Sequence, residues 1–361
     1  MTAVLVTHWG KTGGGPRFTA ELTRALASRC VGIVLQHNAD AEVAADLATA
    51  AEVTETVRTY GRSRASVLAS LWRLPVNAWQ THRLVRRHRV TCVVSAMEGP
   101  FQSLAVPLVL PRRVRYVTIV HDASEHPGDG HPVKRLGRRN ELARADAVVT
   151  LSTDVTRRLV EEGRVVAERA VTLFHPAFGT AGRPRPVPGR GARIGFLGRL
   201  VAYKGLDLFV EVARAVHRAR PDLRFEVWGD GPERGVRSRD TSGDVGWHLG
   251  WIPEAEMDRR VRELDLVVLP YVEASQSGVA ALAAAAGVPC VVTPVGGLVE
   301  QVGGRGGTVA DDVSAAAVAD TVLRVLGDPA EYQRLSTEGV RSARGDRSWD
   351  VFATRLLEVT R

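Results

Sequence analysis

Two cations, Arg199 and Lys204, flank a short turn that directly follows an apolar run. The run, Ile194–Leu197, is aliphatic or aromatic with one glycine, which predicts a short buried strand. Beyond the turn, apolar residues repeat at helical spacing from Leu206 to Val216. The amino terminus of a helix carries about half a positive charge. With the two side chains it makes an anion site, so the pattern predicts a phosphate-bearing ligand.

A histidine and an aspartate occupy a comparable position in the first half of the chain. Val114–Val120 is predicted to be a buried strand, and it delivers His121 and Asp122 at its carboxyl end. A lone histidine is usually structural. The carboxyl ends of parallel strands face the ligand crevice in α/β folds, however, which favours a functional histidine here.

The amino terminus repeats the strand, loop and helix pattern. Ala3–Thr7 is predicted to be a buried strand, and a loop with Gly13, Gly14 and Gly15 separates it from a helix. Such a loop can cradle a phosphate. A tight turn that lets the helix pack closely on the sheet explains the same spacing equally well.

Strands alternate with helices along the whole chain. Further strands are predicted at Val31–Leu35, Cys92–Ser95, Ala145–Leu151, Val171–Leu173, Arg224–Gly231, Leu264–Pro270 and Pro289–Thr293. Residues 40–64 are polar and Ala-rich, which favours a helix or a loop. The alternation predicts doubly wound parallel sheets with helices on both faces, and Gly182–Ala192, rich in Pro and Gly, is predicted to link two domains.

Positive charge is concentrated in the first half of the chain. The 361 residues carry a formal charge of +8 and a sequence pI near 10.0. Residues 1–180 hold 24 Lys or Arg against 16 Asp or Glu, whereas residues 181–361 hold 24 of each. A basic half can meet nucleic acid, an anionic lipid surface or an anionic substrate. Nucleic acid is disfavoured because no reader motif is present.

The cysteines and the apolar runs indicate in which cellular compartment the protein is expected. Cys30, Cys92 and Cys290 are isolated among apolar residues, as buried thiols in a reducing cytosol are. No cysteine pair has metal-ligand spacing and no Asp-x-Asp pair occurs, so neither a metal nor another cofactor is expected. The first apolar run lacks a preceding basic region, which predicts a strand rather than a signal peptide. No apolar run approaches the roughly 18 residues that span a bilayer.

Five motifs follow one another between residues 193 and 302: GRL-x3-KG, a strand ending in G-x-G, LGWIP, a strand ending in Pro before SGV and an Ala-rich helix, and G-x-P-x-V-x-T-x-x-G-G. Their order resembles the donor half of family 4 glycosyltransferases. The resemblance implies the GT-B fold, two Rossmann-like doubly wound domains that face each other across a cleft. It implies an acceptor-binding domain at 1–180, a nucleotide-sugar-binding domain at 181–345, and a helix at 346–361 that crosses back to the first.

The resemblance also assigns roles to individual residues. The implied catalytic residues are His121, Arg199, Lys204 and Glu273. The implied ligands of the donor diphosphate are Gly14, Gly15, Gly198, Arg199, Lys204, Ser277, Gly278 and Val279. The nucleoside would contact Gly229, Gly231, Trp251 and Ile252, and the acceptor would contact Gly13, Glu98 and Asp122.

The chain departs from the family at two glutamates, which commonly lie eight positions apart. Here Ala274 and Leu282 occupy those positions. Glu273 is one position away and could contact the donor sugar, but nothing replaces the second glutamate, which contacts the ribose. The loop Gln276–Val279 (QSGV) resembles that of a bacterial subgroup in which backbone N–H groups still meet the diphosphate.

The leading hypothesis is a cytoplasmic, metal-independent, retaining glycosyltransferase of biosynthesis. It would move a hexosyl or N-acetylhexosaminyl group from a nucleoside diphosphate to a small-molecule or polyprenyl-linked glycan acceptor. A nucleotide-sugar epimerase of the same fold and a catalytically silent partner of another transferase are the alternatives. A dinucleotide oxidoreductase is disfavoured because no glycine turn completes its fingerprint.

A basic helical region leaves two interpretations open. Residues 66–89 contain Trp72 and Trp79 and end in a cluster of arginines. Aromatic residues beside arginines can lie on an anionic membrane, as a peripheral contact at the inner membrane face. The helical spacing favours the other interpretation, a helix that packs on the core and has a solvated basic end.

Overall fold

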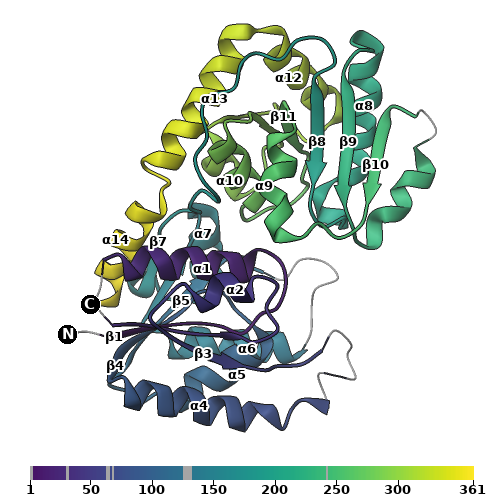
Figure 1. Ribbon diagram of the computed structural model, residues 1–361. Coiled ribbons are helices and arrows are strands. Elements are labelled where there is room, and N and C mark those ends of the chain that lie inside the picture. Colours follow the sequence, from purple (N-terminus) through teal and green to yellow (C-terminus); the bar gives the residue numbers. More distant parts are fainter. Residues whose placement is uncertain (1–2, 30–31, 62–65, 67–68, 125–131, 241–242) are drawn as a thin grey trace. The chain divides into compact units, whose positions relative to one another are not determined.

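The computed structural model describes residues 3–29, 32–61, 66, 69–124, 132–240 and 243–361 (Figure 1). Cys30 lies outside them. The chain divides into two compact units. Unit 1 comprises Met1–Leu173 and Trp349–Arg361, and unit 2 comprises Phe174–Ser348. The last helix therefore belongs to unit 1, although the whole of unit 2 separates it from the rest in sequence.

The sheet of unit 1 is parallel throughout, with the order β3-β2-β1-β4-β5-β6-β7. The strands are β1 (Ala3–His8), β2 (Ile33–Asn38), β3 (Val53–Val57), β4 (Val90–Ser95), β5 (Arg115–Val120), β6 (Ala147–Thr150) and β7 (Ala170–Thr172). The order runs outward from β1 in both directions, which makes the sheet doubly wound and confirms the predicted fold class.

The expectation of a helix or loop over residues 40–64 is wrong at β3. This strand pairs with β2 at the edge of the sheet. Its side chains Thr54, Glu55 and Thr56 are partly or fully exposed, so no apolar run marks it. Edge strands often carry polar side chains, because only one side of the strand is paired.

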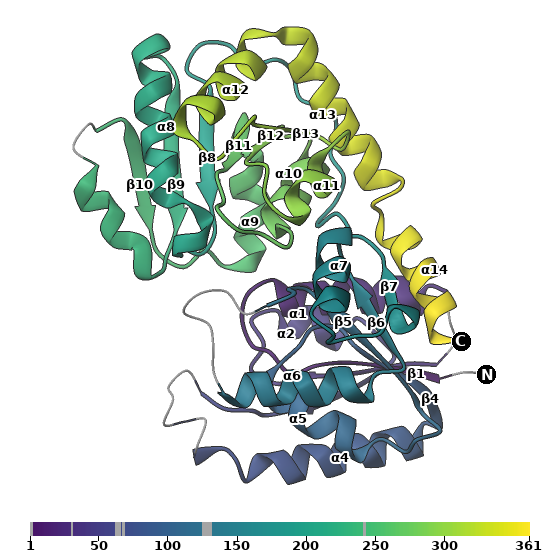
Figure 2. The same ribbon diagram turned by 180° about the vertical axis from the view of Figure 1, so that it is seen from behind.

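The helices of unit 1 cover both faces of this sheet (Figures 1 and 2). They are α1 (Gly14–Ala27), α2 (Ala44–Ala48), α4 (Arg73–Arg87), α5 (Pro100–Val109), α6 (Pro132–Arg144), α7 (Thr153–Glu161) and α14 (Trp349–Thr360). Helices α1 and α14 pack together on one face. Helices α4, α5 and α6 form a row on the other, where α5 touches both neighbours.

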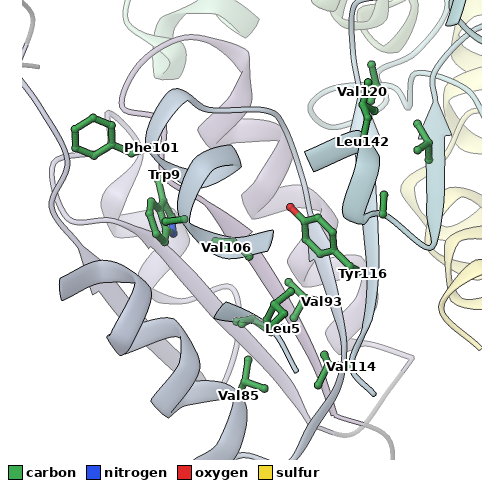
Figure 3. Close-up of a cluster of buried hydrophobic side chains, with 14 of the residues drawn as sticks. Leu5, Trp9, Val85, Val93, Phe101, Val106, Val114, Tyr116, Val120 and Leu142 are labelled. Atoms are coloured by element: carbon green, nitrogen blue, oxygen red, sulfur yellow. The ribbon is translucent and has the colours of Figure 1, made fainter. Parts of the chain in front are cut away.

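A cluster of buried apolar side chains joins the sheet of unit 1 to α4 and α5 (Figure 3). Leu5 and Val93 from the strands meet Val85 from α4 and Val106 from α5, and each is at most 3% exposed. Burying one such side chain contributes about 1.5–3 kcal/mol. The cluster therefore fixes which side of α4 faces the sheet.

Unit 2 has a six-stranded parallel sheet in the order β10-β9-β8-β11-β12-β13. The strands are β8 (Arg193–Leu197), β9 (Arg224–Gly229), β10 (Val245–Leu249), β11 (Leu266–Leu269), β12 (Cys290–Val292) and β13 (Gly307–Val309). The helices are α8 (Leu206–Ala219), α9 (Glu254–Arg262), α10 (Gly278–Ala286), α11 (Gly297–Val302), α12 (Ala315–Gly327) and α13 (Pro329–Arg344). No described helix is long and apolar enough to cross a bilayer.

Helix α14 is held on unit 1 by aromatic contacts and polar bonds. The ring of Phe18 in α1 lies edge-on to Trp349, at 5.0 Å between centroids, and to Phe352, at 5.9 Å. Arg115 donates a hydrogen bond of 2.9 Å to the carbonyl of Val359. Because Phe352 is fully buried, it supplies the apolar part of this attachment.

We expect Phe352→Ala to lower the free energy of unfolding by about 3–5 kcal/mol, since it leaves a cavity where α14 meets α1. Chemical denaturation followed by circular dichroism measures the loss, and limited proteolysis tests whether α14 detaches. Leu357→Ala, at a half-buried position of the same helix, is the matched control. Equal losses in the two variants would contradict the role given to Phe352.

Candidate active site

Three loops at the carboxyl edge of the unit 2 sheet approach one another backbone to backbone. A Cβ on Gly229, the last residue of β9, would lie 1.9 Å from the carbonyl oxygen of Gly198, which follows β8. A Cβ on Gly205 would lie 1.9 Å from the carbonyl oxygen of Pro270, after β11. Glycine is therefore required at both positions, and the loops after β8, β9 and β11 form one unit.

Gly205 has a second reason to be glycine. Its φ is 67°, in the left-handed region, and it forms the N-cap of α8 directly after the short 3₁₀ turn η2 (Ala202–Lys204). Left-handed backbone is costly for residues with a Cβ. The turn ends at Lys204 and the helix begins one residue after Gly205, which holds the lysine at the helix amino terminus as predicted.

Lys204 lies against aromatic and backbone groups. Its Nζ is 5.3 Å from the ring centroid of Tyr271 and would be 3.1 Å from a Cβ on Gly198. In the described part of the chain no carboxylate forms an ion pair with it. Burial lowers the pKa of Lys204 to about 8, and the charge of Arg199 contributes in the same direction. The two predicted cations are thus close enough to repel each other. A bound anion would offset both this repulsion and the cost of holding the lysine charge away from water.

Arg199 is oriented by the same turn, because its guanidinium lies 3.4 Å from the hydroxyl of Tyr203. Val279 is nearby: a Cβ on Gly198 would lie 3.9 Å from Val279 Cγ2. The structure therefore gathers Gly198, Lys204 and Val279, which the sequence separates by up to 81 positions.

The amino terminus of α10 offers a second set of donors. The Ser277 hydroxyl caps the helix by accepting from the Ala280 N–H at 3.4 Å. Gln301 brackets Ser277: the Ser277 N–H donates to its Oε1 and its Nε2 donates to the Ser277 carbonyl, both at 2.8 Å. The Ser277 N–H is thus already used, whereas the N–H groups of Gly278 and Val279 belong to the first turn and have no partner within the helix.

The two positions of the missing glutamates are filled by packing. Ala274 is 3% exposed and Leu282 is 5% exposed, so both side chains belong to the interior. Glu273 is half-buried in the loop before α10. The position predicted to contact the ribose thus carries a buried leucine of α10.

The predicted nucleoside residues Trp251 and Ile252 follow β10, the strand that contributes His248 to an aromatic stack. Trp251 is 48% exposed, and Ile252 is half-buried next to it. The ring of Trp228 is stacked with His248 at 3.7 Å between centroids, and the guanidinium of Arg260 lies 4.0 Å from the centroid of Trp228. A Cβ on Gly231 would lie 2.3 Å from the Leu200 carbonyl, so this glycine serves the loop packing.

In unit 1, His121 is buried at the carboxyl end of β5. It is 7% exposed, and its ring lies edge-on to Phe18 at 4.7 Å between centroids. Because a carbonyl only accepts, its Nε2 must donate to the Ala96 carbonyl at 3.0 Å. Burial lowers the pKa of His121. The lowered pKa favours the neutral imidazole, in which Nδ1 carries a lone pair.

His8, at the end of β1, is a residue that the sequence reasoning did not assign. It is 4% exposed, and burial lowers its pKa to about 4. Its Nδ1 lies 3.4 Å from the Met97 carbonyl, and a Cβ on Gly10 or Gly15 would come within 2.7 Å of its Nε2. The glycines of the loop are folded against this ring. A histidine at a strand end directly before a glycine-rich loop was the available signal.

The amino terminus of α1 is open. Its N-cap, Gly13, has φ 80° and no side chain to cap the helix, and the first turn has no acidic residue. A Cβ on Gly13 or Gly14 would meet no atom within 4 Å. The Gly13 N–H points to Glu42 Oε2 at 3.4 Å. There is thus room beside Gly13 and Gly14 for a ligand group, while the Gly13 N–H already faces the Glu42 carboxylate.

The predicted acceptor residues Glu98 and Asp122 are linked by Arg138. The guanidinium lies 3.4 Å from Glu98 Oε1 and donates to the Asp122 carbonyl. Burial raises the pKa of Glu98 to about 7, against the opposing charge of Arg138. A carboxyl that titrates near neutrality can exchange a proton with a hydroxyl group bound beside it.

Comparisons with known proteins agree with the fold and the motifs. One family model, "Glycosyltransferase Family 4", matches residues 12–181, and another, "Glycosyl transferases group 1", matches residues 191–328. A D-inositol 3-phosphate glycosyltransferase of Arthrobacter is 31% identical over 52% of this chain and 47% of its own. A 2-deoxystreptamine glucosyltransferase of Streptomyces kanamyceticus is 32% identical over 55% of this chain and 56% of its own. These matches span about half of each relative.

Solved structures match over nearly the whole chain. Anabaena HepE in complex with UDP and glucose has a TM-score of 0.73 at 13% identity and covers 99% of both chains. The sucrose-phosphate synthase of Thermosynechococcus elongatus also has a TM-score of 0.73, at 16% identity, and covers 99% of this chain and 98% of its own. At these identities the likeness concerns the fold.

The lowered pKa of Lys204 predicts a pH-dependent affinity for nucleoside diphosphates. Because the free lysine loses its charge as the pH rises through about 8, affinity should fall about tenfold between pH 7 and pH 9. Calorimetric titration at several pH values measures this. Lys204→Arg, which stays charged, controls for titration of the nucleotide. If the affinity of both proteins falls equally with pH, Lys204 does not bind the nucleotide.

Proposed function

The chain belongs to the family 4 glycosyltransferases, and on that premise we propose that it transfers a sugar from a nucleoside diphosphate to a small-molecule or lipid-linked acceptor. The observation that carries the proposal is the pair Arg199 and Lys204 at the tightly packed carboxyl edge of unit 2. Anabaena HepE, which shares the fold, has been crystallised with UDP and with UDP-glucose. A nucleotide sugar is therefore the proposed donor.

Cleavage of the bond to the donor sugar leaves negative charge on the diphosphate. Arg199 and Lys204 would stabilise that charge in the transition state, and removing either should raise the barrier by about 2–4 kcal/mol. The first-turn N–H groups of α10 would add backbone donors at Gly278 and Val279. We propose a metal-independent reaction, because these groups supply positive charge and the sequence has no Asp-x-Asp pair.

Family membership supports retention of configuration. The acceptor would then attack the face that the diphosphate leaves, and a phosphate oxygen would take the acceptor proton. His121 presents a neutral imidazole to the sugar or the acceptor, and Glu98, with a pKa of about 7, is the proposed acceptor-side carboxyl. Glu273 is the proposed contact of the donor sugar.

The names of two relatives guide the choice of acceptor. One acts on D-inositol 3-phosphate and the other on 2-deoxystreptamine, and both compounds are six-membered carbocycles bearing hydroxyl groups. Ring polyols are therefore the first small molecules to test, beside polyprenyl-linked glycans. The proposed compartment is the cytoplasm, where buried thiols such as Cys92 and Cys290 stay reduced.

A thermal-shift panel of UDP, GDP, ADP and dTDP tests the donor site. At 100 times its dissociation constant a nucleotide stabilises the folded protein by about 2.7 kcal/mol. We expect one base to raise the melting temperature of the wild type and to have no effect on Arg199→Ala/Lys204→Ala. The matched control is Arg218→Ala/Arg341→Ala, which removes two exposed arginines from unit 2.

Product analysis then separates the alternatives. Glycosylated ring polyol from the matching nucleotide sugar supports the transferase, and conversion of the nucleotide sugar without any acceptor supports the epimerase. If no nucleotide shifts the wild type, the silent partner of another transferase becomes the better account. The buried Leu282 in place of the ribose glutamate is the observation that favours that outcome.

A further inference from the structure

We propose that the outer face of α4, α5 and α6 docks unit 1 onto an anionic phospholipid surface. This α4–α6 face comprises the exposed side chains of the three helices and of Trp72 just before α4, among them Trp79, Leu108 and Leu136. The inference goes beyond the proposed sugar transfer and does not depend on it, because it rests on exposure and charge alone.

Large apolar side chains are exposed on each of the three helices. In and before α4, Trp72 is 64% exposed and Trp79 is 60% exposed, with Val76 at 42%. Leu108 of α5 is 74% exposed and Leu136 of α6 is 61% exposed. Single exposed apolar residues are ordinary, but a set on adjoining helices marks an interaction site.

The structure bears out the favoured interpretation of the basic helical region, since α4 packs on the core, but it also leaves both tryptophans exposed. Helix α4 buries small and aliphatic residues, among them Ala78, Leu84 and Val85, and turns both tryptophans away from the core cluster. Tryptophan is enriched at membrane interfaces, because its ring is apolar and its N–H can meet water.

The aromatic and basic residues lie on one stripe of α4. At about 100° per residue, Trp72, Val76, Trp79, Arg83 and Arg86 fall within an arc of about 80°. Arg83 places its guanidinium 5.5 Å from the centroid of the Trp79 ring. A long basic side chain beside an aromatic ring can keep its charge among headgroups while its stem and the ring enter the interface.

The three helices carry positive charge without exposed negative charge. The sequence of α4 has four arginines and no Asp or Glu, and α5 has no charged residue. Helix α6 has one acidic residue, Glu141, which is fully buried and accepts hydrogen bonds from Tyr116 and Thr118. Lys134, Arg135 and Arg139 add cations to α6. All three helices are described in full. An anionic lipid surface complements this charge, and each basic residue near it strengthens binding by about fivefold.

Sedimentation with lipid vesicles tests the proposal. We expect the full chain to bind phosphatidylcholine vesicles that contain about one-third phosphatidylglycerol and to bind pure phosphatidylcholine much less. Arg83→Gln/Arg86→Gln/Arg87→Gln should bind the anionic vesicles roughly a hundredfold more weakly. The matched control removes the same charge from exposed positions of unit 2: Arg190→Gln/Arg218→Gln/Arg341→Gln.

Tryptophan fluorescence gives a second readout. Brominated lipids should quench the wild type, and Trp72→Ala/Trp79→Ala should lose that quenching, because the two rings enter the interface. Val166→Ala/Val272→Ala, which trims two exposed valines elsewhere, is the control and should behave as the wild type. Circular dichroism confirms that each variant is folded.

Three outcomes would overturn the proposal: no vesicle binding by the wild type, equal binding by the two arginine triples, or unchanged quenching in the tryptophan pair. A concentration-dependent dimer that the tryptophan substitutions dissolve, without vesicle binding, would assign the α4–α6 face to a second copy. Binding of RNA in place of vesicles would assign it to nucleic acid. The nucleotide thermal shift is measured on the same variants. A loss of vesicle binding with an unchanged thermal shift then concerns the α4–α6 face alone, and a missing thermal shift concerns the donor site alone.

Discussion

The close approach of backbone to backbone at the carboxyl edge of unit 2 is the constraint on which the candidate site depends. The carbonyl oxygens of Gly198 and Pro270 sit where a Cβ on Gly229 or Gly205 would have to be. Any side chain at these glycines would push apart the loops that follow β8, β9 and β11. The positions of Arg199 and Lys204 are therefore set by main-chain contacts, which give a rigid frame to two otherwise flexible side chains.

A rigid frame lets the protein hold a partly desolvated cation without a carboxylate partner. Burial lowers the pKa of Lys204 to about 8, so its charged form is held at a cost in the free protein. A bound diphosphate would compensate for the lost hydration of the ammonium group, because the attraction between the two charges is strong in a site of low dielectric. A permanent ion pair would quench the same charge, which is why its absence among the described carboxylates matters for an anion site.

The sequence predicted the parallel α/β fold and the family because those depend on apolar runs and on glycines at fixed spacing, and both are confirmed. It missed β3, β10 and β13, since polar or short strands at or near sheet edges leave no apolar run. The bacterial subgroup stays a prediction. His8 was overlooked because only the fold brings Met97, Gly10 and Gly15 around its ring. The interior places of Ala274 and Leu282 likewise depend on packing that spacing does not reveal.

The two units differ in how their basic side chains are balanced by acidic ones. In unit 2, arginines such as Arg259 and Arg334 form ion pairs with glutamates one helical turn away, and residues 181–361 hold equal numbers of basic and acidic side chains. In unit 1 the excess charge sits on helices without exposed carboxylates. Such a surface repels itself in water, since like charges on adjoining helices destabilise one another. Its persistence beside two exposed tryptophans is therefore better explained by an anionic partner than by solubility, because charge alone would serve solubility without the aromatic rings.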